Sequence, residues 1–241
     1  LPKFFKRYQI QPVWRADRPG RGRFREFWQC DVDITGSKSL IAEAEVCSAV
    51  AEVLLKLGFS NFEIHLNHRQ LLKCLIKAAG IALENEALTL VAVDKLDKIG
   101  IEGVEKELEQ RGISAAQSRA LLELIQRPCG LDEAGELQRL KQALSDNSEA
   151  ITAIAQLETL TSLLDSSKAA GHYCIDASLA RGLGYYTGPI FEIRSSDFSG
   201  SLGGGGRYDG LIGMFKGSEI PAVGFSIGFE RLLLVLEEKG L

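Results

Sequence analysis

The sequence predicts a mixed, mainly antiparallel α+β fold in which helices flank the sheet. Segments near both ends of the chain alternate apolar and polar residues, which is typical of half-buried strands. The connections between these segments are mostly hairpin-like, and this favours antiparallel pairing. The middle of the chain is instead rich in Leu, Glu, Lys, Gln and Ala at helical spacing, which predicts a helical insertion.

The first two predicted strands form a hairpin. Residues 8–16 are typical of a strand, and a segment rich in glycine, proline and arginine follows them. Residues 27–35 alternate again, and one face of this second strand carries Phe27, Gln29, Asp31 and Asp33. We therefore expect an antiparallel hairpin with an arginine-rich loop at its tip, and we expect its polar face to line a cleft rather than the core.

The remaining elements are predicted in the same way. We expect helices at 39–58, 68–80 and 228–239, and strands at 62–67, 173–178, 188–196 and 222–227. The predicted domains are a first part of the core at 1–81, the helical insertion at 82–170, and a second part of the core at 171–241.

Composition narrows the class of protein. The chain is 45% hydrophobic and 25% charged, as in ordinary globular proteins, and no apolar run is long enough to cross a membrane. Its five cysteines stand singly and no signal peptide is visible, so we expect unpaired thiols in a reducing, cytoplasmic setting. His65 and His68 lack the further ligands of a metal set, so we expect no protein-bound metal. Because the chain begins with Leu, we expect a fragment or a processed product.

Charge is distributed unevenly along the chain. The net charge is −4, but the first 25 residues alone carry +7 and the rest carry −11. Aromatic residues are interleaved with this basic stretch, which is unusual in a disordered tail. A local basic patch on an acidic protein indicates an anion site or a polynucleotide contact.

The stretch GFSIGFERLL, from Gly224 to Leu233, admits two interpretations. Its first five residues fit the G-x-S-x-G elbow of a hydrolase, with Ser226 as the nucleophile. In that arrangement the acid and the histidine follow the serine, but no histidine lies after Ser226. The alternative is a strand, a glycine turn and a helix whose first turn presents Arg231 to a phosphate. We favour the second interpretation.

Glycine-rich segments suggest a nucleotide loop, but the spacing does not fit one. The four glycines at 203–206 do not complete G-x-G-x-x-G, and no G-x-x-x-x-G-K-[ST] motif exists in the chain. The segment 182–188 precedes an apolar strand rather than a helix, which argues against a dinucleotide site. We expect these glycines to let the backbone approach a ligand or another strand closely.

Four arginines lie beside glycine-bracketed turns or on the polar strand face: Arg15, Arg23, Arg181 and Arg231. A guanidinium group binds phosphate and carboxylate through two parallel hydrogen bonds, so four converging arginines would clamp a polyphosphate. The ring of Phe27 could stack on a flat base. Gln29 and Asp33 project from one strand face and could hold a polar, cationic small molecule. Tyr185 and Tyr186 would add an aromatic wall with hydroxyl groups.

Three blocks of sequence resemble the histidyl-tRNA synthetase family, a class II aminoacyl-tRNA synthetase family. Residues 14–36 are similar to motif 2 and its loop, and residues 223–233 are similar to motif 3. Residues 180–193 and 203–215 are similar to the two histidine-specific signature segments. The resemblance covers the whole chain and implies the catalytic domain of a histidine–tRNA ligase.

The resemblance also implies roles for individual residues. ATP would be bound by Arg15, Asp17, Arg23, Phe27 and Arg231. Histidine would be bound by Arg15, Gln29, Asp33, Arg181, Tyr185 and Tyr186. Arg15 and Arg181 would be the catalytic residues, and Arg181 would stabilise charge on the α-phosphate. Mg²⁺ would arrive with ATP, tRNA(His) would accept the histidyl group, and the full-length protein would be a cytoplasmic homodimer.

The chain departs from the family pattern in three places. Gly184 stands where the family often has Asp, and nothing matches motif 1 or the anticodon-binding domain. The fragment alone is therefore expected to be weakly active or inactive. Two alternatives are a non-catalytic regulatory subunit of ATP phosphoribosyltransferase, which typically lacks the catalytic arginine, and an RNA-binding module that uses the basic N-terminal stretch alone.

Overall fold

The computed structural model describes residues 4–16, 18–181 and 184–240. Within them, seven strands form one sheet in the order β1-β2-β7-β6-β5-β3-β4. The strands are β1 (Phe5–Trp14), β2 (Glu26–Thr35), β3 (Phe62–His68), β4 (Tyr173–Ile175), β5 (Pro189–Ser195), β6 (Phe198–Arg207) and β7 (Ala222–Gly228). The pairs β1–β2, β2–β7 and β6–β7 are antiparallel, which confirms the predicted mainly antiparallel α+β fold.

Helices account for most of the other described residues. They are α1 (Ile41–Lys56), α2 (Arg69–Ala78), η1 (Leu83–Asn85), α3 (Glu86–Val93), α4 (Leu96–Gln110), α5 (Ala115–Ile125), α6 (Glu133–Ala143), α7 (Ser148–Asp165), α8 (Gly213–Lys216) and α9 (Phe229–Lys239). The predicted helical character of the middle of the chain is therefore confirmed, although the boundaries proposed for an insertion stay a prediction. None of these helices is both long and apolar enough to span a lipid bilayer.

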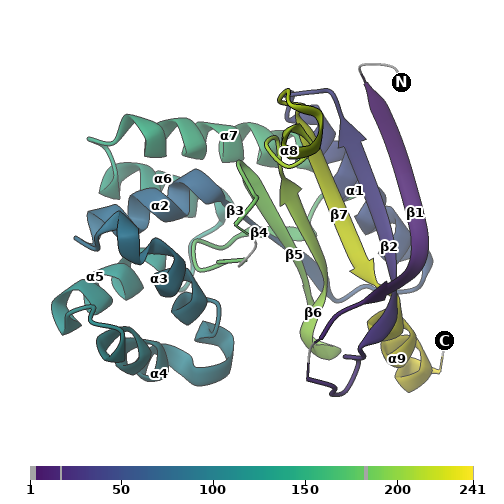
Figure 1. Ribbon diagram of the computed structural model, residues 1–241, viewed down its shortest axis with the longest axis horizontal. Coiled ribbons are helices and arrows are strands. Elements are labelled where there is room, and N and C mark those ends of the chain that lie inside the picture. Colours follow the sequence, from purple (N-terminus) through teal and green to yellow (C-terminus); the bar gives the residue numbers. More distant parts are fainter. Residues whose placement is uncertain (1–3, 17, 182–183, 241) are drawn as a thin grey trace. The chain divides into compact units, whose positions relative to one another are not determined.

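The described residues divide into two compact units. The sheet unit comprises the described parts of Leu1–His65, Leu160–Tyr173 and Phe191–Leu241, and the helical unit comprises those of Leu66–Thr159 and Cys174–Ile190. In the sheet unit, β1, β2, β7 and β6 lie side by side (Figure 1). Helix α1 packs on β2 and β7, and α9 packs on β2 and β6.

The apolar face of the hairpin reaches the core of the sheet unit at Ile34, whereas Tyr8, Ile10 and Trp28 of the hairpin are exposed. Ile34 pairs with Val223 across β2 and β7, and both side chains are buried. Helix α1 contributes Cys47, Val50 and Leu54, which are buried. All five cysteines of the chain are free thiols, as expected.

A buried ion pair joins α1 to the end of β6. The Arg207 guanidinium donates from Nε to Glu43 Oε1 at 2.5 Å and from Nη2 to Glu43 Oε2 at 2.7 Å. Its Nη1 also donates to the carbonyl of Ser37 and to Asp209 Oδ1, each at 3.0 Å. Because a buried charge is tolerated only when it is paired and hydrogen-bonded, these contacts explain how Arg207 and Glu43 can both lie in the interior.

Strand β6 is not predicted by the sequence pattern, because glycine is depleted in strands and β6 contains four consecutive glycines. The glycines are needed because the neighbouring strand lies very close to them. A Cβ atom on Gly203 would lie 2.6 Å from the carbonyl oxygen of Ser226, and one on Gly205 would lie 2.0 Å from that of Gly224. The expectation that these glycines let another strand approach closely is therefore confirmed for β7.

Candidate functional site

One face of β2 carries a row of polar side chains that we call the polar face: Gln29, Asp31 and Asp33. The register with β7 places them opposite Gly228, Ser226 and Gly224, respectively. Directly paired residues of antiparallel strands share one face of the sheet. The polar face therefore adjoins a stretch of β7 with two glycines and one serine, where little side-chain volume rises above the backbone. The prediction that Gln29 and Asp33 share a strand face is confirmed.

Asp33 is held by side chains from two other strands. Tyr208, directly after β6, donates its hydroxyl hydrogen to Asp33 Oδ1, and Arg7 Nε on β1 lies 3.4 Å from Asp33 Oδ2. Burial raises the pKa of the Asp33 carboxyl, while the Tyr208 hydrogen bond and the Arg7 charge counter part of that rise. Gly224 makes room for this carboxyl, since a Cβ there would lie 2.1 Å from Asp33 Oδ1.

Two buried oxygen atoms beside Asp33 lack a hydrogen-bond partner among the described residues. They are Asp31 Oδ1 on β2 and Ser226 Oγ on β7, which occupy directly paired positions. A buried polar atom without a partner costs free energy, so such atoms commonly mark a place where a ligand or water binds. Ser226 therefore lies on the polar side of the sheet, and the described structure brings no histidine to its hydroxyl.

Arg15 lies over the aromatic ring of Phe27. The Arg15 Cζ atom is 5.2 Å from the ring centroid, and its Nη2 lies 3.5 Å from Gln29 Oε1. A guanidinium group at this distance from a ring makes a favourable cation–π contact. The structure therefore brings together three of the residues that the sequence predicts for ATP and histidine, while the stacking of Phe27 on a base stays a prediction.

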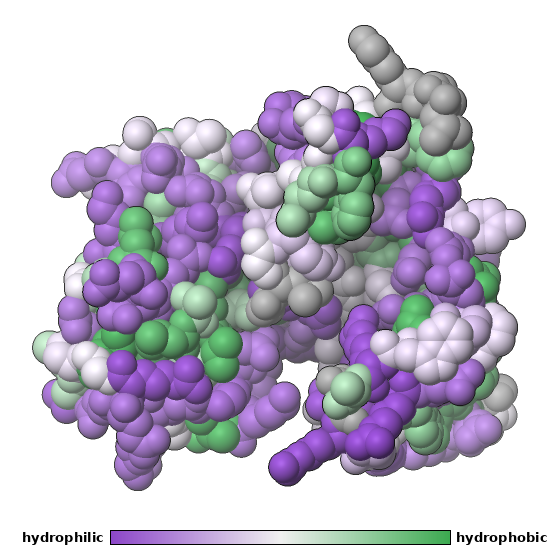
Figure 2. Space-filling model, viewed as in Figure 1, coloured by the Kyte–Doolittle hydropathy of each residue, from purple (hydrophilic) through white to green (hydrophobic). Residues whose placement is uncertain are grey.

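The loop between β1 and β2 is fastened to α9. Gly20 and Arg23 exchange backbone hydrogen bonds of 2.9 Å, which form a tight turn around Gly22. Arg231 donates from Nε to the carbonyl of Gly22 at 3.3 Å and also donates to the carbonyl of Ser201. The side chain of Arg23 is exposed, and Figure 2 shows hydrophilic side chains gathered over this loop. Asp17 lies outside the described residues.

The acidic neighbour of Arg231 also contacts the hairpin. Glu230 Oε1 accepts a hydrogen bond of 2.7 Å from the backbone N–H of Trp28 on β2. The first turn of α9 is thereby tied to the hairpin through Glu230 and to the hairpin loop through Arg231. These contacts are consistent with the interpretation that this stretch builds a helix start beside the sheet rather than a hydrolase elbow.

The remaining predicted residues belong to the helical unit. Arg181 is half-buried, Tyr186 is buried, and the rings of Tyr185 and Tyr186 lie with their centroids 4.7 Å apart and tilted by 54°. Because these residues and the polar face lie in different compact units, the convergence of all four arginines on one ligand stays a prediction.

Sequence reasoning missed three polar residues near Asp33. The register places Arg7 directly opposite Asp33, a relation that follows once the hairpin pairing is known. The strand alternation places Asp31 on the same face but indicates no role for it. No local pattern indicates Tyr208, because its contact with Asp33 depends on the order β2-β7-β6 within the sheet.

The sheet, its arginine-bearing hairpin and the helix start at Arg231 together define the catalytic fold of the class II aminoacyl-tRNA synthetases. A family model described as histidyl-tRNA synthetase matches residues 6–232. The chain therefore belongs to the histidyl-tRNA synthetase family. The histidine–tRNA ligase of Gloeobacter violaceus is 46% identical over 246 residues, which cover 100% of this chain and 52% of that protein.

Solved structures show the same relation. The histidyl-tRNA synthetase from Nostoc sp. PCC 7120 matches with a TM-score of 0.85 and 31% identity, covering 98% of this chain and 55% of that one. A Bacillus halodurans structure described as an ATP phosphoribosyltransferase regulatory subunit/histidyl-tRNA synthetase matches with a TM-score of 0.78 at 23% identity, covering 96% of this chain and 57% of the other. At that identity the second match shows the fold alone. The chain spans about half the length of these relatives.

Proposed function

We propose that the full-length protein containing this chain activates L-histidine with ATP and transfers the histidyl group to tRNA(His). Membership of the histidyl-tRNA synthetase family carries the proposal. The polar face supports it, because Gln29 and Asp33 offer polar groups opposite two glycines of β7, which leave room for a ligand on that face of the sheet. The regulatory-subunit alternative is not favoured, since a histidine–tRNA ligase matches this chain at 46% identity over 100% of its residues.

The proposed reaction has two steps. A carboxylate oxygen of histidine attacks the α-phosphorus of ATP, and the bond from that phosphorus to the pyrophosphate oxygen breaks. A hydroxyl of the terminal tRNA ribose then attacks the histidyl carbonyl carbon, and AMP leaves. Neither step requires a protein nucleophile, so positioning and charge stabilisation account for the rate. A site rich in arginine and poor in histidine suits this chemistry.

The residues of the sheet unit would hold both substrates. Arg15 would bind the α-phosphate and the carboxylate of histidine, and Phe27 would stack on adenine. Gln29 and Asp33 would bind the amino acid, with the Asp33 carboxylate accepting a hydrogen bond from the imidazole. The contacts of Asp33 with Tyr208 and Arg7 support this role, because they restrain the carboxylate in one orientation.

Other residues would act on the phosphates and on the imidazole. Asp17 would lie near adenine, while Arg23 and Arg231 would contact the outer phosphates, and Mg²⁺ would arrive together with ATP. Arg181 would stabilise the charge that develops on the α-phosphate and contact histidine, and Tyr185 and Tyr186 would help to recognise the imidazole ring. The exposed position of Arg23 supports its part, since a loop side chain can close over a ligand after it binds.

The proposed setting is that of a cytoplasmic homodimer. The relative from Oryza sativa carries the description cytoplasmic, and the five free thiols of this chain suit a reducing compartment. The helical unit would lean toward the acceptor arm of tRNA(His). Dimerisation would depend on motif 1 of the family, which no segment of this sequence matches.

The deciding experiment is histidine-dependent exchange of pyrophosphate into ATP by the full-length protein. Exchange should require histidine and should not occur with other amino acids. Exchange that is absent, or equally fast with other amino acids, would overturn the proposal. For this chain alone, a rise of its melting temperature with histidine or ATP would show that it binds that substrate without the rest of the protein.

Replacement of Arg181 tests the proposed charge stabilisation. Arg181→Ala should lower the exchange rate by about 10³- to 10⁵-fold, the range for arginines that stabilise charge in phosphoryl transfer. Arg194→Ala is a suitable control, since Arg194 is a half-buried arginine of β5 that pairs with Glu192 and has no proposed role. Near-normal exchange by Arg181→Ala would contradict the role given to Arg181.

A further inference from the structure

The segment that leads to Arg181 begins at an edge of the sheet. Strand β4 is the last strand in the sheet order, and the N–H of Asp176 donates to the carbonyl of Leu66 on β3 at 2.9 Å. Because backbone groups of successive strand residues point to opposite sides, the N–H and carbonyl of Ile175 point away from β3. These two groups need partners other than a strand.

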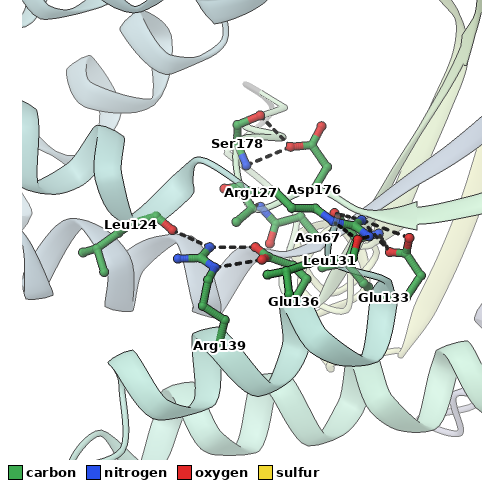
Figure 3. A network of polar contacts seen from close by, with 11 residues as sticks. Asn67, Leu124, Arg127, Leu131, Glu133, Glu136, Arg139, Asp176 and Ser178 are labelled. Carbon is green, nitrogen blue, oxygen red and sulfur yellow. Dashed lines mark hydrogen bonds and ion pairs between the residues drawn. The ribbon is translucent and has the colours of Figure 1, made fainter. Parts of the chain in front are cut away.

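An ion pair of the helical unit supplies both partners. Glu133, the first residue of α6, accepts a hydrogen bond from the N–H of Ile175 through Oε2, and Arg127 Nη1 donates to the carbonyl of Ile175 at 3.3 Å (Figure 3). Arg127 Nη1 also lies 2.9 Å from both carboxylate oxygens of Glu133. Together the two side chains occupy the hydrogen-bonding positions that a neighbouring strand would fill.

The same ion pair is anchored to the connection between α5 and α6. Arg127 Nε donates to the carbonyl of Leu131 at 3.1 Å, and its Nη2 donates to the same oxygen. The Arg127 and Glu133 side chains are 24% and 28% exposed, so solvent screens their attraction only partly. The position of Ile175 therefore depends on a rigid turn of the helical unit.

Residues 176–179 are held by further side-chain hydrogen bonds. Asn67 is fully buried, and its Nδ2 donates to the carbonyls of Ala177 and Leu179, each at 3.1 Å. Asp176 Oδ1 accepts from the N–H of Ser178 at 2.9 Å. The chain is thus restrained from Ile175 to Leu179, two residues before Arg181.

We propose that the Arg127–Glu133 pair, together with Asn67, positions Arg181 for catalysis. The inference rests on the proposed function and names residues that act on Arg181 through the backbone. Arginine has a long and flexible side chain, so its guanidinium is accurately placed only if its backbone is held. A displacement of about 1 Å in a reacting group can lower a rate by about 10²-fold. Helices α5 and α6 would thereby influence a reaction whose atoms they do not contact.

The test uses Glu133→Ala in the full-length protein. This variant should lower kcat of histidine-dependent exchange by about 10- to 100-fold, with KM for ATP changed less than about threefold, because Arg181 acts mainly on the charge that develops during reaction. Glu133→Gln keeps an acceptor for the Ile175 N–H and should recover most of kcat. An unchanged kcat in Glu133→Ala would overturn the proposal.

Arg139→Ala is the matched control. Arg139 joins α5 to α6 by donating to the carbonyl of Leu124 at 2.9 Å and to Glu136, and its side chain is 22% exposed, close to that of Arg127. None of its described hydrogen bonds reaches residues 175–181. It should lower the melting temperature about as much as Glu133→Ala does but leave kcat within about twofold. An equal loss of kcat in both variants would indicate general loosening of the helices and overturn the proposal.

Two further measurements separate this proposal from the proposed function. In an Arg181→Ala background, Glu133→Ala should cause no additional loss of kcat, whereas independent effects would multiply. Amide hydrogen exchange at residues 175–179 should be faster in Glu133→Ala than in Arg139→Ala, and unchanged exchange there would overturn the proposal without reference to activity. If the wild-type protein shows no histidine-dependent exchange, the proposed function and the catalytic role of the pair both fail, while hydrogen exchange still decides whether the pair holds the segment.

Discussion

At the scale of single residues, Asp33 has the most defined surroundings on the polar face. Its carboxyl is restrained by Tyr208 and Arg7, and Gly224 leaves it room. Burial raises its pKa while both neighbours favour the ionised form. A carboxylate held in this way is suited to accept a hydrogen bond from a ligand in one direction, as recognition of an imidazole requires.

Replacement of Asp33 by Asn tests this recognition. The amide keeps the shape but loses the charge, so KM for histidine should rise by about 10- to 100-fold, as expected for a charge-assisted hydrogen bond worth about 1.5–3 kcal/mol. KM for ATP should change little. Tyr208→Phe retains the charge and loses only the restraint, so its effect should be smaller. Steady-state kinetics of pyrophosphate exchange measure the KM values of both variants. An unchanged KM for histidine in Asp33→Asn would show that Asp33 does not recognise the imidazole.

At the scale of elements, the glycines of β6 show why a strand can be hidden in a sequence. Glycine is depleted in strands, so a run of four argues against one. The close approach of β7 reverses this preference, because a side chain at Gly203 or Gly205 would collide with the backbone of β7. The tetraglycine segment is a strand because of a tertiary contact with β7, and no pattern within the segment itself can reveal that contact.

Gly205→Ala should therefore destabilise the sheet unit. The added Cβ would lie 2.0 Å from a backbone oxygen that cannot rotate away, so β6 and β7 must separate. Overpacking typically costs about 1–3 kcal/mol, and denaturant unfolding of the chain should show a loss at least that large. Gly210→Ala is the control, since a Cβ there has no atom within 4 Å and should change the stability by less than about 0.5 kcal/mol.

The start of α2 makes stability depend on pH. His68 is 4% exposed, its Nδ1 accepts from the N–H of Gln70 at 3.0 Å, and its Nε2 lies 2.9 Å from Gln156 Oε1. Since Nδ1 accepts a hydrogen bond, the imidazole is neutral in this arrangement. Burial lowers the pKa of His68, partly countered by the hydrogen bond with Gln156.

The sign of the pH effect follows from this lowered pKa. Below about pH 6.5 the unfolded chain binds a proton at His68 that the folded chain excludes, so stability falls as the pH drops. The loss continues down to the folded-state pKa, with a slope of up to about 1.4 kcal/mol per pH unit. His68→Asn keeps a helix-capping acceptor and should remove this part of the dependence. Denaturant unfolding at pH 7.0 and 5.5 gives the loss of stability on acidification for the wild type and for His68→Asn. An equal loss in both proteins would show that His68 is not the group responsible.

At the scale of the whole molecule, the sequence predicts the fold class because strand alternation and helical spacing are local properties. The period of two along a strand also places Gln29 and Asp33 on one face without any knowledge of the sheet. The contact of Tyr208 with Asp33 and the contacts of Arg127 with Ile175 join residues far apart in the chain. They depend on strand order and on how helices pack, which local patterns do not encode.

The distribution of charge along the chain bears on where the proposed tRNA substrate would bind. The first 25 residues carry +7 and the remainder −11, so a polyanion should be attracted to the first 25 residues more than to the rest of the chain. Arg18 and Arg21 are exposed in the hairpin loop, and Arg21 pairs only at the surface with Glu238. A surface pair of this kind is weak, so Arg21 can exchange its partner for a phosphate.

The logarithm of the binding constant of tRNA(His) for the full-length protein should therefore fall linearly with the logarithm of the salt concentration. Each lost phosphate contact makes this slope shallower by about 0.7–0.9, so the double variant Arg18→Gln, Arg21→Gln should make it shallower by about 1.5. Lys38→Gln with Lys56→Gln is the matched control, because it removes two charges that are 71% and 74% exposed outside the hairpin. The control should lower affinity only slightly and leave the slope unchanged, since distant exposed charges are screened. An equal change of slope in both double variants would show that tRNA binding depends only on the net charge of the protein. The hairpin loop would then have no specific part in binding.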